Sequence, residues 1–373
     1  MSAPVLAIGL MSGTSLDGID AALIETDGEA QVRAIAFVGI DYSDAQRELL
    51  NAATQAALAQ ATPAQGRETA LAEGMLTRAH ANAVARLLDR AGVRADAVRV
   101  VGYHGQTVAH RPDRGWTWQL GDGAGLAQAC GIDVVADFRS ADVAAGGQGA
   151  PLLPVYHAAL CAALPKPVGV LNLGGVANIT FVGENGELVA FDTGPANGLV
   201  DSWIEAHTGA RFDAGGALAA SGRVDETVVT AMLDHPYFDL PAPKSLDRND
   251  FTIQPARGLS VADGAATLVE FTARSVAEGL QLLPDAPRRL FVAGGGRHNP
   301  FLLARIAAQV GIVPEPAEAL GLDGDATEAE GFAYMAVRRL RGLPISFPGT
   351  TGVGRPLPGG VLHAHLASGV HRG

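Results

Sequence analysis

The same unit opens both halves of this 373-residue chain: an apolar strand-like run, a turn of small residues and a second apolar run. The first copy, LAIGLMSGTSLDGIDAALI, occupies residues 6–24, and the second, VGVLNLGGVANITFV, occupies residues 168–182. The letters differ, but both copies are typical of β-hairpins and start about one domain apart. The repeat therefore predicts two related halves that face each other across a cleft, each offering a glycine turn.

The segments around the hairpins predict an α/β fold in two domains, residues 1–165 and 166–373. Helical periodicity alternates with short apolar runs in both halves, which is typical of sheets flanked by helices. A strand within residues 132–154 is expected to lead into a long loop of glycine and alanine. The other main predicted elements are helices at 43–62, 66–92, 262–283, 299–311 and 325–342 and strands at 98–112 and 289–296.

Composition narrows the class of protein. Apolar residues make up 48% of the chain and charged residues 18%, a globular composition. The net charge of -12 argues against a nucleic-acid binder, which needs clustered Lys and Arg. The N-terminus has no basic region before its apolar run, and no run of about 18 apolar residues predicts a membrane span. We expect a cytoplasmic protein.

Three glycine loops indicate nucleotide binding when they are taken together. The third, in FVAGGGRHNPFLLARI, leaves a strand and enters a helix, whose N-terminus favours an anion or a polar ligand. Glycine and serine let backbone N–H groups approach a phosphate closely. No Walker sequence occurs, and neither Lys166 nor Lys244 lies near a glycine loop, which excludes a Walker-type NTPase. The segment GDGAGLAQ is not a dinucleotide-binding fingerprint.

Asp192-Thr193-Gly194 follows an apolar residue, as in the signature of aspartic proteases. That chemistry needs two carboxylates that share one proton, so a chain of this length should carry two copies. Only one copy occurs. We therefore set the protease interpretation aside.

Seven motifs together, in this order, resemble the bacterial anhydro-N-acetylmuramic acid kinase family: MSGTSLDGID, GYHGQTVAHRP, DFRSADVAAGGQGAPLLP, LNLGGVANITF, FDTGPANGLVD, PKSLDRNDF and AGGGRHNP. The resemblance implies two actin-like ATPase (ribonuclease H-like) domains of the acetate and sugar kinase, actin and heat-shock ATPase superfamily, flanking a nucleotide and sugar cleft. It implies that 1,6-anhydro-N-acetylmuramic acid, ATP and water give N-acetylmuramic acid 6-phosphate and ADP, in peptidoglycan recycling.

The resemblance also implies which residues bind ATP, with Mg²⁺ as cofactor and its protein ligands left unknown. With no phosphate-loop lysine, backbone N–H groups, Mg²⁺ and domain closure must meet the phosphate charge. The ATP-binding residues implied are Gly13, Thr14, Ser15, Leu16, Asp17, Gly18, Ile19 and Asp20 in the first turn, Asn172, Gly174, Gly175 and Asn178 in the second, and Gly294, Gly295 and Gly296 on the adenosine side.

By the same resemblance, Asp192 is the base that takes a proton from water, and an ordinary carboxyl pKa near 4 would leave it ionised at neutral pH. Glu328 is the second carboxylate, although Glu330 lies close enough in sequence to exchange places with it. The substrate-binding residues implied are Gln106, Asp137 and Arg139, the last bound to the lactyl carboxylate through its guanidinium. His104 fits a histidine satisfied within its own turn better than a base.

One segment departs from the family pattern: Lys244-Ser245-Leu246-Asp247 stands where the family has Lys-Ser-Thr-Gly. Loss of that glycine changes the freedom of the loop, so no role is carried over to it. Two alternatives stay open. One is another small-molecule kinase of the superfamily, and the other is a non-catalytic ATP-binding regulator, which would not need Asp192, Arg139 and Gln106 together. Homodimerisation is also left open.

Overall fold

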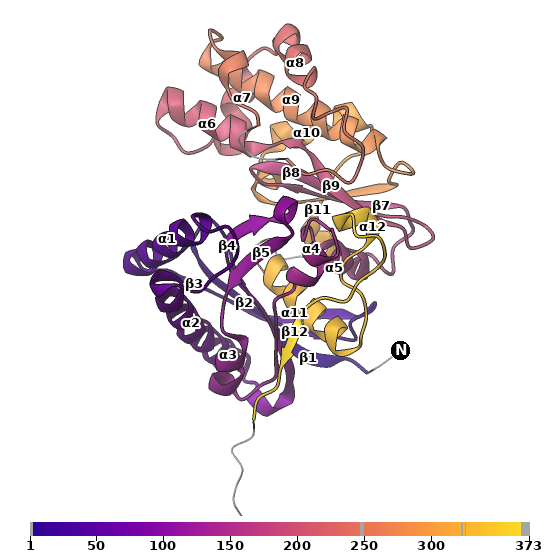
Figure 1. The fold of residues 1–373 in the computed structure, drawn as a ribbon. Coiled ribbons are helices and arrows are strands. Elements are labelled where there is room, and N and C mark those ends of the chain that lie inside the picture. Colours follow the sequence, from indigo (N-terminus) through magenta and orange to yellow (C-terminus); the bar gives the residue numbers. More distant parts are fainter. Residues whose placement is uncertain (1–2, 247–249, 322–323, 325, 367–373) are drawn as a thin grey trace, which may run out of the picture. The chain divides into compact units, whose positions relative to one another are not determined.

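The structure is a computed structural model that describes residues 3–246, 250–321, 324 and 326–366. It divides into two compact units: residues 1–162 with 325–373, and residues 163–324. Figure 1 labels most of the helices and strands of both units. In the described part of the chain, no helix combines the length and apolar character needed to span a lipid bilayer.

The first unit is built on one mixed sheet. Its strands run in the order β12-β6-β4-β1-β2-β3, and β5 pairs with β4. β1, β2 and β3 are antiparallel neighbours, whereas β4 lies parallel to β1 and β6 lies parallel to β4. The strands are β1 (Val5–Ser12), β2 (Gly18–Thr26), β3 (Val32–Asp41), β4 (Val98–Arg111), β5 (Trp116–Leu120), β6 (Val134–Ala136) and β12 (Val361–His363).

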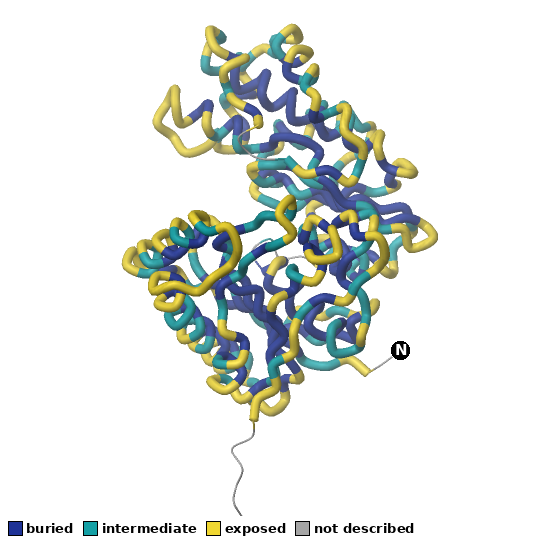
Figure 2. The backbone as a smooth tube through the Cα atoms, viewed as in Figure 1, coloured by how far each residue is buried: buried dark blue, intermediate teal, exposed yellow. Residues whose placement is uncertain are grey.

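Helices cover both faces of this sheet. Successive side chains of a strand point to opposite faces, and in β4 the ring of Tyr103 packs on His80 of α2 while that of His104 packs on Phe332 of α11. The buried strands and the exposed outer sides of α1 and α2 can be followed in Figure 2. The helices are α1 (Asp44–Leu58), α2 (Arg67–Ala91), α3 (Gly123–Cys130), α4 (Ser140–Ala144), α5 (Pro154–Leu160), α11 (Thr327–Leu340) and α12 (Pro348–Thr351).

Helix α11 belongs to the first unit, although the sequence places it at the end of the chain. It packs on β1, β2 and β4. The backbones touch at two glycines: a Cβ on Gly9 would lie 1.7 Å from the carbonyl oxygen of Ala329, and one on Gly102 would lie 2.1 Å from that of Phe332. The predicted second domain of residues 166–373 therefore differs from the observed unit, which ends near residue 324.

The second unit also has one sheet, in the order β11-β10-β7-β8-β9. β7, β8 and β9 are antiparallel neighbours, whereas β10 lies parallel to β7 and β11 lies parallel to β10. Helix α9 packs on β9 and is flanked by the other helices of the unit. The elements are β7 (Val168–Leu173), β8 (Val176–Val182), β9 (Leu188–Pro195), α6 (Asn197–Thr208), α7 (Ala217–Ser221), α8 (Glu226–Leu233), α9 (Val261–Gln281), β10 (Arg289–Ala293), α10 (Pro300–Val310) and β11 (Glu315–Pro316).

The two sheets share one topology. Each begins with three antiparallel strands and adds two parallel strands on the free side of the first, so β3-β2-β1-β4-β6 corresponds to β9-β8-β7-β10-β11. The hairpins at residues 6–24 and 168–182 are the first two strands of each set. The predicted α/β fold of two related halves is confirmed.

Candidate active site

The first glycine loop connects β1 to β2 in the first unit. Leu16 has a left-handed backbone (φ 59°), is largely buried, and its N–H donates to the carbonyl of Gly13 at 3.2 Å. Thr14 and Ser15 are exposed, and their backbone N–H groups have no acceptor within the described residues. Backbone N–H groups of this kind are suited to a phosphate. Gly18, Ile19 and Asp20, which were also predicted to bind ATP, lie in β2 itself.

Three groups from distant elements hold this loop. Gln106 of β4 donates from Nε2 to the Gly13 carbonyl at 3.1 Å and accepts a hydrogen bond from the Ser12 hydroxyl. Arg47 donates to the Leu16 carbonyl at 3.1 Å, and the Tyr42 N–H donates to the Asp17 carbonyl at 2.9 Å. Gln106 is only 1% exposed, so its amide supports the loop. The substrate contact that the sequence predicted for Gln106 stays a prediction.

Arg139 is held by His104 and by a loop carbonyl. Its Nε donates to His104 Nε2 at 3.0 Å, and its Nη1 donates to the carbonyl of Gly149 at 2.8 Å. His104 Nδ1 lies 2.7 Å from the Gly105 carbonyl, so it carries the proton and leaves Nε2 as the acceptor. Burial, and then the charge of Arg139, hold the pKa of His104 well below its usual range. The imidazole is therefore neutral.

The first turn of α11 carries the two glutamates that the sequence could not separate. Glu328 is exposed, yet the protein atoms around it reduce its hydration enough to raise its pKa, and the neighbouring Arg139 guanidinium opposes that rise. Glu330 is buried and accepts a 2.7 Å hydrogen bond from the hydroxyl of Tyr156. Glu330 therefore has a structural role as a buried hydrogen-bond acceptor, whereas Glu328 is the carboxylate whose charge interacts with that of Arg139.

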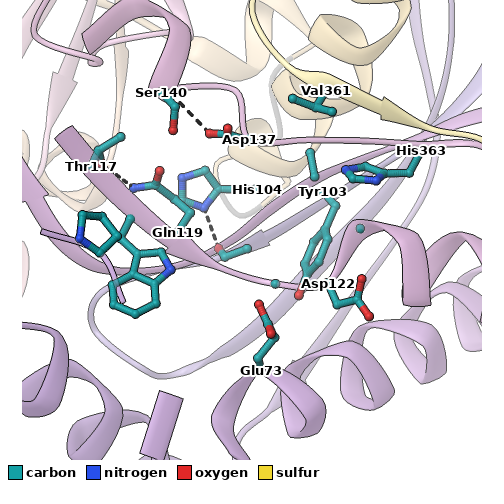
Figure 3. Close-up of a pocket in the computed structure, with 16 residues that line it drawn as sticks. Glu73, Tyr103, His104, Thr117, Gln119, Asp122, Asp137, Ser140, Val361 and His363 are labelled. Carbon is teal, nitrogen blue, oxygen red and sulfur yellow. Dashed lines mark hydrogen bonds between the residues drawn. The ribbon is translucent and has the colours of Figure 1, made fainter. Parts of the chain in front are cut away.

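Asp137 lies at the rim of a cavity of about 530 Å³ in the first unit. Its backbone is left-handed (φ 54°), and its carboxylate accepts from the N–H of Ser140 at 3.3 Å, at the start of α4. His104 and Ser140 line the same cavity. Figure 3 shows these side chains and the cavity around them.

The second glycine turn, Gly174–Gly175, lies in the second unit and is held by backbone atoms. The carbonyl of Gly174 accepts from the N–H of Asn197 at 2.9 Å, and that of Gly175 accepts from Ala196 at 3.0 Å and Gly198 at 3.2 Å. The first two N–H groups of α6 thus donate to the turn. The N–H groups of Gly174 and Gly175 themselves have no acceptor in the part of the chain described.

The third loop, Gly294–Gly296, packs beside the second turn. Gly294 has a left-handed backbone (φ 77°), and a Cβ there would lie 2.6 Å from Asn172 Oδ1 and 2.7 Å from the Leu173 carbonyl oxygen. The side chain of Asn197 donates to that same Leu173 carbonyl at 2.9 Å. The structure therefore brings the second and third predicted loops together in one unit.

Asp192 continues a polar row that crosses three adjacent strands. Asn172 of β7 pairs with Asn178 of β8, which pairs with Asp192 of β9. Directly paired residues in antiparallel strands project from the same face of the sheet, about 4.5–5.5 Å apart at Cβ. The predicted base is thus on the same face as two predicted ATP-binding residues.

The segment that departs from the family pattern holds Asp192. The N–H of Leu246 donates to the Asp192 carboxylate at 2.8 Å, and the Lys244 carbonyl accepts from the Asp192 N–H at 3.0 Å. Burial raises the pKa of Asp192 to about 6, although the Leu246 N–H lowers it. The expected pKa near 4 is therefore corrected upward. Asp247, the last residue of the departing segment, lies outside the described residues.

Comparison with known proteins identifies the family. Residues 5–364 match the family described as anhydro-N-acetylmuramic acid kinase. The chain belongs to this family. It is 65% identical to a protein of that name from Rhizorhabdus wittichii, over 96% of this chain and 99% of the relative, and 52% identical to one from Zymomonas mobilis, over 96% and 100%. A relative of the same name from Acidiphilium cryptum is 54% identical over 95% of this chain and 97% of its own length.

In this member of the anhydro-N-acetylmuramic acid kinase family, sequence reasoning missed Asp142, which shapes the surroundings of Arg139. Asp142 is 1% exposed, accepts from the Gly149 N–H at 2.6 Å and accepts from the Thr351 hydroxyl at 2.6 Å. It fixes the loop whose carbonyl holds Arg139. The only sequence signal was an acidic residue before a glycine-rich stretch, in ADVAAGGQG.

The described residues contain no cluster of three or more His, Cys, Asp or Glu side chains that could hold a metal ion. Mg²⁺ in nucleotide sites is usually held by one or two carboxylates, water and the substrate's own phosphates. Among the described residues, the exposed Asp17 of the first loop is a carboxylate of the kind that such an arrangement uses.

Proposed function

We propose that the protein is an ATP-dependent kinase that opens 1,6-anhydro-N-acetylmuramic acid and phosphorylates O6, giving N-acetylmuramic acid 6-phosphate and ADP in cell-wall recycling. Relatives that carry this name match almost the whole chain at 65% and 52% identity. The observation that carries the proposal is Asp192, a partly exposed carboxylate with its pKa raised to about 6, on the same sheet face as Asn172 and Asn178. We place the reaction in the cytoplasm, where ATP is available.

Asp192 is proposed as the general base. It takes a proton from water as the water oxygen bonds to the anomeric carbon and the bond between that carbon and O6 breaks. O6 then bonds to the γ-phosphorus of ATP, the bond to ADP breaks, and one proton is released to solvent. A base works best when its pKa lies near the working pH, so a pKa of about 6 suits Asp192 better than an ordinary one.

Backbone N–H groups are proposed to bind the phosphates of ATP. Thr14 and Ser15 in the first unit, and Gly174 and Gly175 in the second, offer backbone N–H groups that have no acceptor within the described residues. Such fixed donors stabilise charge that develops in phosphoryl transfer. Mg²⁺, when bound with ATP, would neutralise phosphate charge, and the exposed Asp17 in the first loop is the carboxylate closest in sequence to those donors.

Arg139 is proposed to bind the lactyl carboxylate. Its Nε is engaged by His104 and one Nη1 proton by Gly149, which leaves the other Nη1 proton and Nη2 for an end-on, two-point contact. The neutral His104 adds no charge that would compete. Glu328, beside Arg139, is proposed to orient a sugar hydroxyl or the attacking water.

The test is mass spectrometry of the product formed from the anhydro-sugar and ATP in ¹⁸O water. The proposal expects one ¹⁸O at C1 and none in the transferred phosphoryl group. ATP without sugar should be hydrolysed slowly, because closing the site around substrate keeps water from the γ-phosphate. An ATP hydrolysis rate that is the same with and without sugar, together with no sugar phosphate, would instead favour the ATP-binding regulator.

A further inference from the structure

The loop of residues 145–149 is rich in glycine, yet its backbone N–H groups are already engaged. Those of residues 145–147 donate to carbonyls of α4 at 2.9–3.0 Å. Those of the next two residues donate to the Thr351 carbonyl at 2.7 Å and to the Asp142 carboxylate at 2.6 Å. A loop that binds phosphate needs N–H groups without other acceptors. This loop is therefore a fixed structural element of the first unit, and its role has to be sought in what it holds.

Two buried side chains, Asp142 and Thr351, hold this loop together. The Thr351 hydroxyl donates to Asp142 Oδ2 at 2.6 Å, while Asp142 Oδ1 accepts from the Gly149 N–H. Asp142 belongs to α4 and Thr351 to α12, which lie close together in Figure 1 although 209 positions separate the two residues. Hydrogen bonds to a carboxylate are about twice as strong as those between neutral groups. The pair therefore joins the C-terminal segment of the chain firmly to the loop.

The glycines of the loop allow it to approach its neighbours closely. A Cβ on Gly147 would lie 2.2 Å from Asp142 Oδ1 and 2.6 Å from Val353 Cγ1, and one on Gly149 would lie 2.7 Å from Val143 Cγ2. Gly149 also has a left-handed backbone (φ 71°), which glycine adopts without strain. A side chain at either position would displace the loop or its neighbours. The glycines thus fix the place of the Gly149 carbonyl.

The Gly149 carbonyl is the point at which the loop contacts Arg139. It accepts from Arg139 Nη1 at 2.8 Å, and His104 accepts from Nε at 3.0 Å. Two contacts at different nitrogens fix both the position and the plane of a guanidinium, which is rigid and flat. Burial lowers the pKa of Arg139, and the charges of Glu328 and then Asp142 oppose that change. Asp142 therefore acts on Arg139 through the loop and through its charge.

Resting on the proposed function, we propose that Asp142 and Thr351 are positioning residues for Arg139, so that α12 controls how strongly the enzyme prefers a sugar with a carboxylate. The pair holds the loop, and the loop holds the Nη1 end of the guanidinium. The donors that remain then meet the lactyl carboxylate at two points. Because a two-point contact depends on the plane of the guanidinium, loss of the Thr351 hydroxyl weakens the contact with the carboxylate. A sugar without that carboxylate is little affected.

The test compares 1,6-anhydro-N-acetylmuramic acid with the analogue that has a hydroxyl in place of the lactyl ether. The preference for the first sugar is measured as a ratio of kcat/KM values and, by calorimetry, as a ratio of binding constants. Arg139→Ala should lower both ratios about 10–100-fold, and Thr351→Val should lower them at least about fivefold. Thr351→Ser keeps the hydroxyl and should retain the wild-type ratios. Thr350→Val is the matched control, because the Thr350 hydroxyl bonds to Phe347 at the start of the same helix and should not affect the preference.

A double variant tests whether Thr351 acts through Arg139. If it does, Thr351→Val should not lower the preference further when it is added to Arg139→Ala. A further fall in the double variant would overturn the inference, and so would equal losses on both sugars in Thr351→Val, which would give Thr351 a merely structural role.

The wild type separates this inference from the proposed function. If it phosphorylates both sugars without preference, the inference fails while the kinase proposal stands. If it binds the carboxylate-bearing sugar with the expected preference but transfers no phosphate, the kinase proposal fails, and the binding constants of the Thr351 and Arg139 variants still decide the inference.

Discussion

The two glycine turns occupy equivalent places in two sheets of the same topology, yet they are held in different ways. The first is a five-residue loop, 13–17, fixed by side chains from distant elements, chiefly Gln106 and Arg47. The second is a two-residue turn whose carbonyls accept from the backbone at the start of α6. The first turn thus depends on long-range side-chain contacts, whereas the second is built into the backbone beside Asp192.

From this difference we propose that the two copies of the hairpin have different roles in the reaction. The second turn has few adjustable contacts, and its sheet carries the polar row Asn172, Asn178 and Asp192. The first loop leaves Thr14 and Ser15 exposed and is held by the side chains of Gln106 and Arg47. The second copy carries the residue that we propose as the base, and the first carries the loop that we propose binds the phosphates of ATP.

The largest expected effect is on kcat, from a substitution of Asp192 in the second unit. Asp192→Asn keeps the shape of the side chain but cannot accept a proton, so kcat should fall about 10²–10⁴-fold while ATP and sugar still bind. Steady-state kinetics and calorimetry measure both quantities. Asp201→Asn is the control, because burial also raises the pKa of Asp201 to about 6 and it should change kcat only a few-fold. Phosphorylation by the Asp192→Asn variant at a near-normal rate would show that Asp192 is not the general base.

Rigidity of the second turn is tested by a pair of glycines. A Cβ on Gly198 would lie 2.9 Å from the Gly175 carbonyl oxygen, whereas one on Gly175 would meet nothing within 4 Å. Gly198→Ala should therefore destabilise the protein by about 1–3 kcal/mol, as overpacking does. Gly175→Ala should change its stability by less than about 0.5 kcal/mol. Thermal unfolding compares the two, and equal midpoints would show that the turn yields easily.

Dependence of the first loop on side chains is tested at Gln106. Gln106→Leu removes the hydrogen bonds to Gly13 and Ser12, and we expect KM for ATP to rise about tenfold with little change in KM for the sugar. Gln106→Glu keeps the acceptor for Ser12 and should have a smaller effect. A rise in KM for the sugar alone would instead favour the substrate contact that the sequence predicted.

The smallest expected effect is a displacement of the pH profile. Because only ionised Asp192 accepts a proton, kcat should fall as the pH drops through about 6, the raised pKa of this carboxyl. Leu246→Pro removes the N–H that lowers this pKa, so the acidic limb should move to higher pH. Leu246→Ala keeps the N–H and should leave the limb in place. If neither substitution moves the acidic limb of the pH profile, that limb reports the titration of a group other than Asp192.

Local patterns predicted much of the fold. The period of residues 66–92 and the position of Gly92 predicted α2, which spans Arg67–Ala91 and ends at Gly92 in a left-handed conformation. Both hairpins were also predicted from their turns. The short helix α4 (Ser140–Ala144) was expected to be loop, because five residues carry too little periodicity to be recognised.

Local sequence patterns could not predict the contacts between residues that are far apart in the sequence. Arg139 and His104 are 35 positions apart, and Leu246 and Asp192 are 54 apart, so neither pair leaves a periodic trace. The contact from Leu246 also uses a backbone N–H group, which every residue except proline carries, so the residue type gives no signal for it. Glu328 and Glu330 could be separated only once Tyr156 was seen to bind Glu330. The assigned roles of the site residues stay predictions that the substitutions above can test.

The return of α11 to the first sheet determines when that sheet can be completed during synthesis. The second unit is continuous in sequence, and all its strands are available once residue 324 has been made. The first unit must wait for residues 327–340 before β1, β2 and β4 are covered by α11. On a ribosome that adds about 5–20 residues per second, the N-terminal strands are therefore exposed for the longest time, and the later part of the chain can finish folding before the earlier part.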